Sequence, residues 1–94
     1  MQAKIKRNNR ETENNIYLAR EFIITYIVRM QLQEADIIEY SVLERFANYD
    51  LNMDDVMNAV DEMDKEHLIE KIASDKGTFI KLTEKGYRIF NKVI

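Results

Sequence analysis

The chain contains no cysteine, and this absence excludes disulfide bonds, thiolate metal ligands and cysteine nucleophiles. It has a single histidine, so a catalytic or zinc-binding cluster of histidines is not expected. Proline is absent and glycine occurs only twice, which leaves neither a glycine-rich phosphate loop nor a dinucleotide fingerprint. These absences predict a protein that is not an enzyme and that uses no cofactor and no metal.

Long apolar segments are missing as well. The run Phe22-Ile23-Ile24 is broken by Thr25 and then by Arg29, far short of the roughly 20 apolar residues that span a bilayer. The first ten residues are polar and basic and lack the apolar centre of a secretory signal. We therefore expect a cytoplasmic protein that does not engage a membrane.

The 94 residues, 46% hydrophobic and 33% charged, have the composition of one globular domain. A core of this size stabilises a fold only modestly, so association with a second copy would help. Many asparagines, isoleucines and lysines without proline are typical of an AT-rich genome, such as that of a virus or mobile element.

The charge is distributed unevenly, although the net charge is only −3. Residues 1–33 hold six basic and three acidic side chains, residues 34–75 hold three basic and thirteen acidic, and residues 76–94 hold five basic and one acidic. A strongly acidic middle is thus flanked by two basic segments. Such an asymmetry bears on the choice of partner rather than on the fold.

Residues 1–11 lack hydrophobic periodicity and are interpreted as a mobile basic arm that precedes one domain over residues 12–94. Thr12 is the predicted cap of a long helix that runs to about Gln33. Its apolar residues form three stripes at helical spacing, Ile16–Ala19–Ile23–Ile27–Met30, Leu18–Phe22–Tyr26 and Tyr17–Ile24–Val28. A surface helix needs only one stripe, so we expect burial on several sides, either in a monomeric core or in a homodimer through the third stripe.

The acidic middle contains two further helical patterns. Asp36–Glu39 is interpreted as a short strand or an extended link. Ser41 and Glu44 have capping-box spacing, which predicts a short helix over about 42–49. Its inward residues are expected to be Val42, Leu43, Phe46 and Ala47. Asn52 is the predicted cap of a third helix over about 53–66, with a buried stripe of Val56, Ala59, Val60 and Met63.

From Ile69 onward the sequence pattern changes from the helical period to the alternation of strands. Residues 69–73 and 78–82 predict a β-hairpin, with Gly77 supplying the turn residue that tolerates positive φ. Thr83 is the predicted cap of a last helix that runs from Glu84 to about Val93. Its apolar side is expected to contain Ile89, Phe90 and Val93.

Two segments, Met63-Asp64-Lys65-Glu66-His67-Leu68-Ile69-Glu70 and Phe79-Ile80-Lys81-Leu82-Thr83-Glu84-Lys85-Gly86, resemble the end of the third helix and the closure after the hairpin in MarR-like and PadR-like regulators. The resemblance implies an α+β, mostly helical winged helix-turn-helix fold with a long N-terminal helix and a C-terminal helix. The family usually has glycine where His67 stands. We interpret His67 as a helix-ending residue, the alternative being a pH switch or a ligand, and expect Gly86 to contact the hairpin closely.

In such regulators the third helix enters the major groove of DNA and the hairpin, or wing, lies near the phosphate backbone. The exposed face of the third helix is expected to contain Asn52, Met53, Asp54, Asp55, Asn58, Asp61, Glu62 and Lys65. Asparagines can read adenine edges, but the four acidic side chains of this face should repel phosphates. The wing and arm offer the basic candidates Lys4, Lys6, Arg7, Arg10, Lys71, Lys76 and Lys81.

These features lead to three hypotheses. The first is a dimeric winged-helix protein that regulates transcription and contacts double-stranded DNA through its wing and arm. The second is a protein-interaction module whose acidic third helix docks on a basic partner or imitates DNA. The third, an enzyme using Asp54, Asp55 or Asp61, lacks any accompanying base, nucleophile or metal cluster. Plain solvation of the lysines and of the acidic face also remains open.

Overall fold

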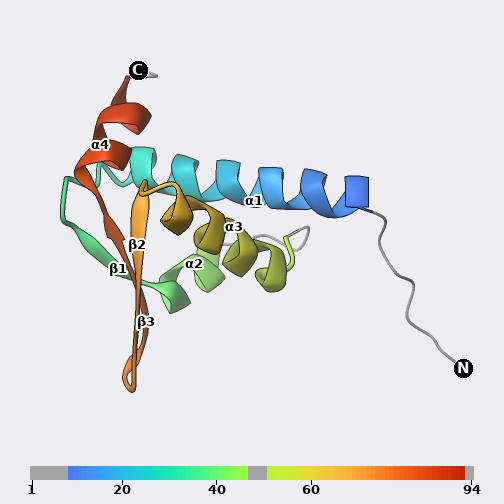
Figure 1. Ribbon diagram of the computed structural model, residues 1–94. Coiled ribbons are helices and arrows are strands. Elements are labelled where there is room, and N and C mark those ends of the chain that lie inside the picture. The colour runs from blue at the N-terminus through green and yellow to red at the C-terminus, as the bar shows by residue number, and fades with distance from the viewer. Residues whose placement is uncertain (1–8, 47–50, 93–94) are drawn as a thin grey trace, which may run out of the picture.

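The computed structural model describes residues 9–46 and 51–92, and the side chains of its first helix from Glu13 onward. Within these residues the chain forms four helices and a three-stranded antiparallel sheet, so it is α+β as expected. The elements are α1 (Asn9–Arg29), β1 (Ile37–Glu39), α2 (Tyr40–Phe46), α3 (Met53–Lys65), β2 (Ile69–Ser74), β3 (Gly77–Leu82) and α4 (Glu84–Asn91). Helix α3 lies beneath α1, and α4 lies above the C-terminal end of α1 (Figure 1).

The predicted bounds of the first helix are wrong at both ends. Helix α1 already includes residues 9–11, so Thr12 is not its cap and these three residues are not part of an arm. Residues 9–11 contain neither glycine nor proline, and nothing in them opposes helix extension. The helix ends at Arg29 instead of Gln33. Residues 1–8, the rest of the predicted arm, lie outside the described residues.

Two helices end through a residue in the left-handed conformation. At the end of α1, Gln31 has φ 54° and the next N–H donates to the carbonyl of Ile27 over 3.1 Å. At the end of α3, His67 has φ 63°, and the N–H of Leu68 donates to the carbonyl of Met63 over 3.0 Å. Both are Schellman arrangements, which stop a helix and turn the chain sharply. The interpretation of His67 as a helix-ending residue is confirmed.

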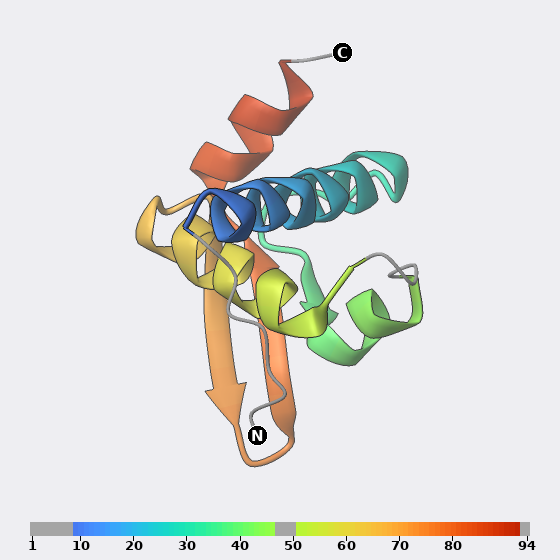
Figure 2. The ribbon, with the colours of Figure 1, turned by 90° about the vertical axis from the view of Figure 1, so that its right-hand side faces the viewer.

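The segment over residues 36–39 contains a strand rather than an extended link. Strand β1 pairs with β3, and β2 pairs with the other side of β3, giving the order β1-β3-β2. The predicted hairpin is confirmed, and Gly77 in its turn has φ 129°. In β3 the side chains of Ile80 and Leu82 are buried beneath the helices, so alternation places Lys81 on the outer face. The hairpin projects beyond the helices (Figures 1 and 2).

Two predictions for the second helix are wrong. Strand β1 runs directly into α2, so Ser41 is the second residue of the helix and cannot cap it; its hydroxyl donates to Glu39 Oε2 over 3.0 Å. Leu43 is buried as expected and Val42 is half-buried, but Phe46 is 58% exposed, with its ring 5.5 Å from that of Tyr26. Ala47 lies outside the described residues.

One core joins α1, α2, α3, the sheet and α4. Its largest fully buried side chains are Ile23, Leu43, Val56, Val60, Met63, Ile69, Ile80 and Leu82. The buried stripe predicted for α3 is confirmed in full. In α4 Phe90 is buried, but Ile89 is 42% exposed, and Val93 lies outside the described residues. In the first stripe of α1, Met30 is exposed because it follows the last helical residue.

Helix α4 is fixed against the start of the hairpin at two points. The Thr83 hydroxyl accepts from the N–H of Gly86 over 3.0 Å, which confirms Thr83 as the cap. Gly86 touches the backbone of Leu68 so closely that a Cβ atom there would collide with the Leu68 carbonyl oxygen and lie 3.1 Å from Leu82 Cδ1. The expected close contact between Gly86 and the hairpin is thus present.

This contact predicts the effect of Gly86→Ala. An ordinary glycine-to-alanine change inside a helix stabilises by about 1 kcal/mol. In α4 the added methyl group must displace backbone atoms, and such overpacking costs about 1–3 kcal/mol. We expect urea denaturation to show a lower free energy of unfolding for this variant. A gain in stability would contradict the contact.

Candidate functional site

The exposed side of α3 carries a stripe of polar side chains. Asn52 caps the helix, since its Oδ1 accepts from the N–H of Asp54 over 2.8 Å. Helical spacing then aligns Asp54, Asn58, Asp61 and Lys65 along the side opposite the core. Asn52, Asp54, Asn58, Glu62 and Lys65 are exposed, whereas Met53 and Asp61 are half-buried. Most of the predicted face is therefore accessible.

Asp55 does not belong to this face. Its side chain is only 4% exposed, because it lies one turn before Ala59 on the buried side of α3. The prediction of an exposed Asp55 is wrong. Asp54 and Asp61 lie on a different side of the helix from Asp55, so the three carboxylates considered for catalysis do not share a surface.

Two acidic residues of α3 form ion pairs within the molecule. Lys71 Nζ of β2 lies 2.8 Å from Asp61 Oδ1. Arg20 of α1 lies 3.2 Å from Glu62 and 2.9 Å from Glu66, and its hydrogen bond to Glu66 raises the pKa of Arg20. The free charge of the α3 surface is thus smaller than its composition indicates. No local pattern around Arg20 indicates this role, because its partners are more than 40 residues away along the chain.

The basic residues predicted for the hairpin do not form one cluster. Lys71 is turned towards α3, where it pairs with Asp61. Lys76 is exposed in the turn, whereas Lys81 is half-buried on the outer face of the sheet. Among the basic candidates of the predicted arm, Lys4, Lys6 and Arg7 lie outside the described residues. Arg10 falls in the first turn of α1, where side chains are outside the described part as well.

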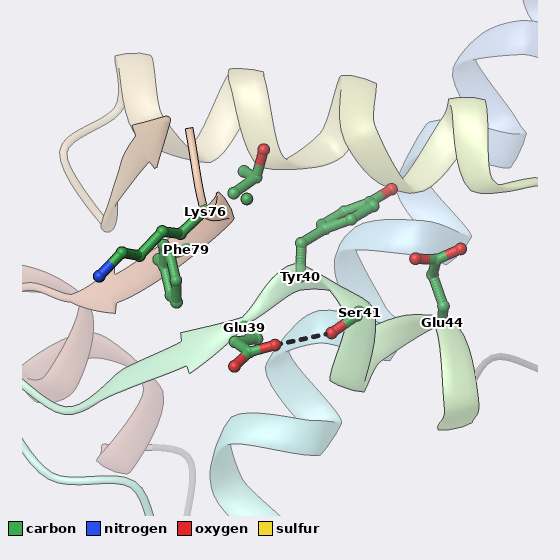
Figure 3. A pocket seen from close by; sticks show the side chains of 8 residues that line it. Glu39, Tyr40, Ser41, Glu44, Lys76 and Phe79 are labelled. Carbon is green, nitrogen blue, oxygen red and sulfur yellow. Dashed lines mark hydrogen bonds between the residues drawn. The ribbon is translucent and has the colours of Figure 1, made fainter. Parts of the chain in front are cut away.

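A hollow of about 240 Å³ separates the start of α2 from the hairpin (Figure 3). Its walls are Glu39, Tyr40, Ser41, Glu44, Lys76, Gly77, Thr78 and Phe79. Within the described part of the chain, neither Glu39 nor Glu44 forms an ion pair. In Figure 3 the ammonium group of Lys76 points away from Glu44. The hollow therefore offers two carboxylates beside the aromatic rings of Tyr40 and Phe79.

Tyr40 reports the electrostatics of this region. Its hydroxyl donates to the carbonyl of Met53 over 3.0 Å and so ties α2 to the start of α3. Burial, followed by the negative charges of Glu44, Asp54 and Asp61, raises the pKa of Tyr40 to about 12. The carboxylates of Glu44 in α2 and of Asp54 and Asp61 in α3 thus all act on the Tyr40 hydroxyl. Sequence reasoning missed this cluster because it assigned Ser41 and Glu44 to a capping box.

In the described residues no group of three or more acidic or histidine side chains is arranged to hold a metal ion. No helix in the same residues combines the length and hydropathy needed to cross a bilayer. Comparisons with family models, curated proteins and solved structures return no match for this chain.

The environment of Tyr40 predicts how stability depends on pH. The folded pKa of about 12 exceeds the ordinary value of 10.0, so folding favours the protonated phenol. Its contribution should be complete below pH 10 and should be lost as the pH rises towards 12. Tyr40→Phe should abolish this loss and, by deleting the bond to Met53, lower the free energy of unfolding at neutral pH by about 1 kcal/mol.

Urea denaturation at several pH values, with phenolate absorbance recorded in parallel, measures both effects. The Tyr40→Phe variant should lack the phenol that ionises near pH 12 in the parent. If the phenol lost in that variant instead ionises near pH 10, the ordinary value, the fold does not raise the pKa of Tyr40 and the predicted pH dependence is contradicted.

Proposed function

We propose that the chain is a winged helix-turn-helix protein that binds double-stranded DNA and regulates transcription. The observation that carries the proposal is the arrangement of α3 and the hairpin. Helix α2 and helix α3 are followed directly by β2 and β3, and β1 completes the sheet in the order β1-β3-β2. A polar helix face beside a projecting hairpin suits a groove and its adjacent backbone.

The base-reading residue in this proposal is Asn58. It lies in the middle of the exposed stripe of α3, and its amide can donate to and accept from an adenine edge. Lys65 on the same stripe and Lys76 in the hairpin turn are exposed and form no ion pair within the described residues. They are the cations that the α3 stripe and the hairpin turn offer to phosphates.

The acidic side chains of α3 should repel DNA phosphates less than their number suggests. Asp61 is paired with Lys71, and Glu62 shares Arg20 with Glu66. Asp54 remains exposed in the first helical turn, where the positive end of the helix dipole favours a carboxylate. In the α3 stripe and the hairpin turn, the exposed charges outside any described ion pair are then Asp54, Lys65, Asp75 and Lys76.

Fluorescence anisotropy with random and genomic duplexes over a range of salt concentrations tests the proposal. Lys65→Ala and Lys76→Ala should each weaken binding to all sequences and reduce the slope of log K against log salt by about 1. Asn58→Ala should leave the slope unchanged and reduce the preference for the best sequence by about 1–3 kcal/mol.

Lys81→Ala is the matched control, because this lysine lies on the outer face of the sheet, away from α3. It should leave both affinity and slope unchanged. Absence of salt-dependent binding by the parent protein at low ionic strength would refute the proposal.

A second candidate function, docking of a basic protein partner, is favoured by the hollow between α2 and the hairpin. The acidic third helix is a weaker docking site than its sequence indicates, because two of its carboxylates are paired internally. Glu39 and Glu44 are unpaired in the described residues and lie beside two aromatic rings. A lysine or arginine side chain can pair with these carboxylates through its charge and can contact the two rings through cation–π interaction.

The double variant Glu39→Lys with Glu44→Lys tests whether the hollow is the docking site. If a basic partner occupies the hollow, the double variant should lose its binding to a lysine-rich peptide in calorimetry. Asp75→Lys, an exposed change in the hairpin turn, is the control and should retain the peptide. Equal binding by the parent and the double variant would exclude the hollow as the docking site.

A further inference from the structure

An apolar groove of about 340 Å³ lies between the C-terminal half of α1 and the end of α2. Figure 2 shows α2 beneath this half of α1. The groove is lined by four apolar or aromatic residues, a threonine and an arginine, namely Phe22, Thr25, Tyr26, Arg29, Met30 and Phe46. Both Met30 and Phe46 are more than half exposed. Large apolar side chains are therefore accessible at this groove, which is typical of interaction sites.

The accessible apolar surface continues along α1 beyond the groove. Leu18 lies one helical turn before Phe22 on the same side of the helix and is 53% exposed. Thr25 and Arg29 extend the same line towards the C-terminal end of α1. At about 1.5 Å per residue, the line from Leu18 to Arg29 spans about 16 Å. The surface is thus about three helical turns long.

This surface is separate from the one predicted for a homodimer. The stripe Tyr17–Ile24–Val28 lies on another side of α1, and none of its three residues lines the groove. Ile24 and Val28 are half-buried and pack against the core, whereas Tyr17 is 59% exposed. The groove is therefore a second exposed region of α1, with its own chemistry.

Arg29 places a positive charge at one end of the groove. It is the last residue of α1, is exposed, and forms no ion pair within the described residues. None of the residues that line the groove is acidic. A carboxylate of an occupant can therefore form a charge-assisted, bidentate pair with the guanidinium. The complementary occupant is apolar along most of its length and acidic at one end.

The walls and the length of the groove favour a helical occupant. All lining residues belong to α1 or α2, apart from Met30 directly after α1, so no strand edge is available to an extended peptide. A small molecule confined to the groove would leave Leu18 exposed. A helix of about three turns covers the whole line from Leu18 to Arg29.

We propose that the groove binds an amphipathic helix of a partner protein. Apolar side chains at positions i, i+4 and i+7 of that helix pack against Leu18, Phe22 and Phe46. An acidic side chain at one end of the same helix pairs with Arg29.

Helix α4 of a second copy does not have this chemistry. Its exposed Ile89 lies beside Arg88 and Lys92, whose positive charges would repel Arg29. The proposal is also independent of DNA binding, because no residue of α3 or of the hairpin lines the groove. Either proposal can therefore fail without the other.

Selection from a phage-displayed library of random peptides, with the parent protein as bait, tests the groove. Peptides of about 16 residues are long enough for about four helical turns. We expect the enriched sequences to share apolar residues at positions i, i+4 and i+7, with aspartate or glutamate one turn before or after them. Fluorescence anisotropy with one labelled peptide of this pattern then measures its dissociation constant for each variant. No enrichment of this pattern would overturn the proposal.

Phe46→Glu and Leu18→Glu should each raise this constant about tenfold or more, because each places a charge against the apolar side of the peptide. Arg29→Glu should raise it about tenfold, and a peptide with lysine in place of its acidic residue should regain binding to this variant. Retention of the peptide by both Phe46→Glu and Leu18→Glu would place its site elsewhere and overturn the proposal. Weaker binding to Phe46→Glu but not to Leu18→Glu would confine the ligand to the groove itself and exclude a helix of three turns.

Ile37→Glu and Arg88→Glu are the matched controls, because they make the same chemical changes at exposed positions of β1 and α4. Both should bind the peptide as tightly as the parent. Circular dichroism verifies that each variant is folded, and Phe46→Ala, with the same expected direction, replaces Phe46→Glu if that variant does not fold. If light scattering shows a dimeric parent and a monomeric Phe46→Glu variant, the occupant is a second copy and the proposal is overturned.

Discussion

The junction between Leu68 and Thr83 holds the hairpin, α3 and α4 in one arrangement. The Thr83 hydroxyl lies 2.6 Å from the His67 carbonyl and 2.8 Å from the Leu68 carbonyl, and it accepts from Gly86. These contacts join the end of α3, both ends of the hairpin and the start of α4. They fix the direction in which the hairpin projects and the place of α4 beside α1. The surface proposed for DNA depends on this junction.

The elements around this junction could be predicted from the sequence because their signals are local. Asn52 and Thr83 each cap a helix by bonding to an N–H two or three residues away, and Gly77 supplies the turn of the hairpin. The start of α2 could not be predicted in this way. Strand β1 is held by pairing with β3, about 40 residues later, and this pairing brings the chain directly from Glu39 into α2. Ser41, which has the spacing of a cap, is therefore helical.

The same limit applies to the candidate site. Helical periodicity identified the exposed stripe of α3 except for Asp55, which lies on the edge of the buried side. It could not show that Lys71 and Arg20 reach acidic residues of α3 from other elements. Composition therefore overstates the negative charge of α3 and does not reveal the unpaired carboxylates beside Tyr40. The acidic middle of the chain serves partly to bind α1 and β2 to α3.

In the proposed complex, α3 and the hairpin together form the DNA-binding surface. Amide chemical-shift mapping during titration with a duplex tests it most directly, because each residue reports separately. We expect shifts centred on Asn58, Lys65 and Lys76, with Lys81 and the outer face of the sheet unaffected. Shifts absent from α3, or confined to residues 39–44, would contradict it.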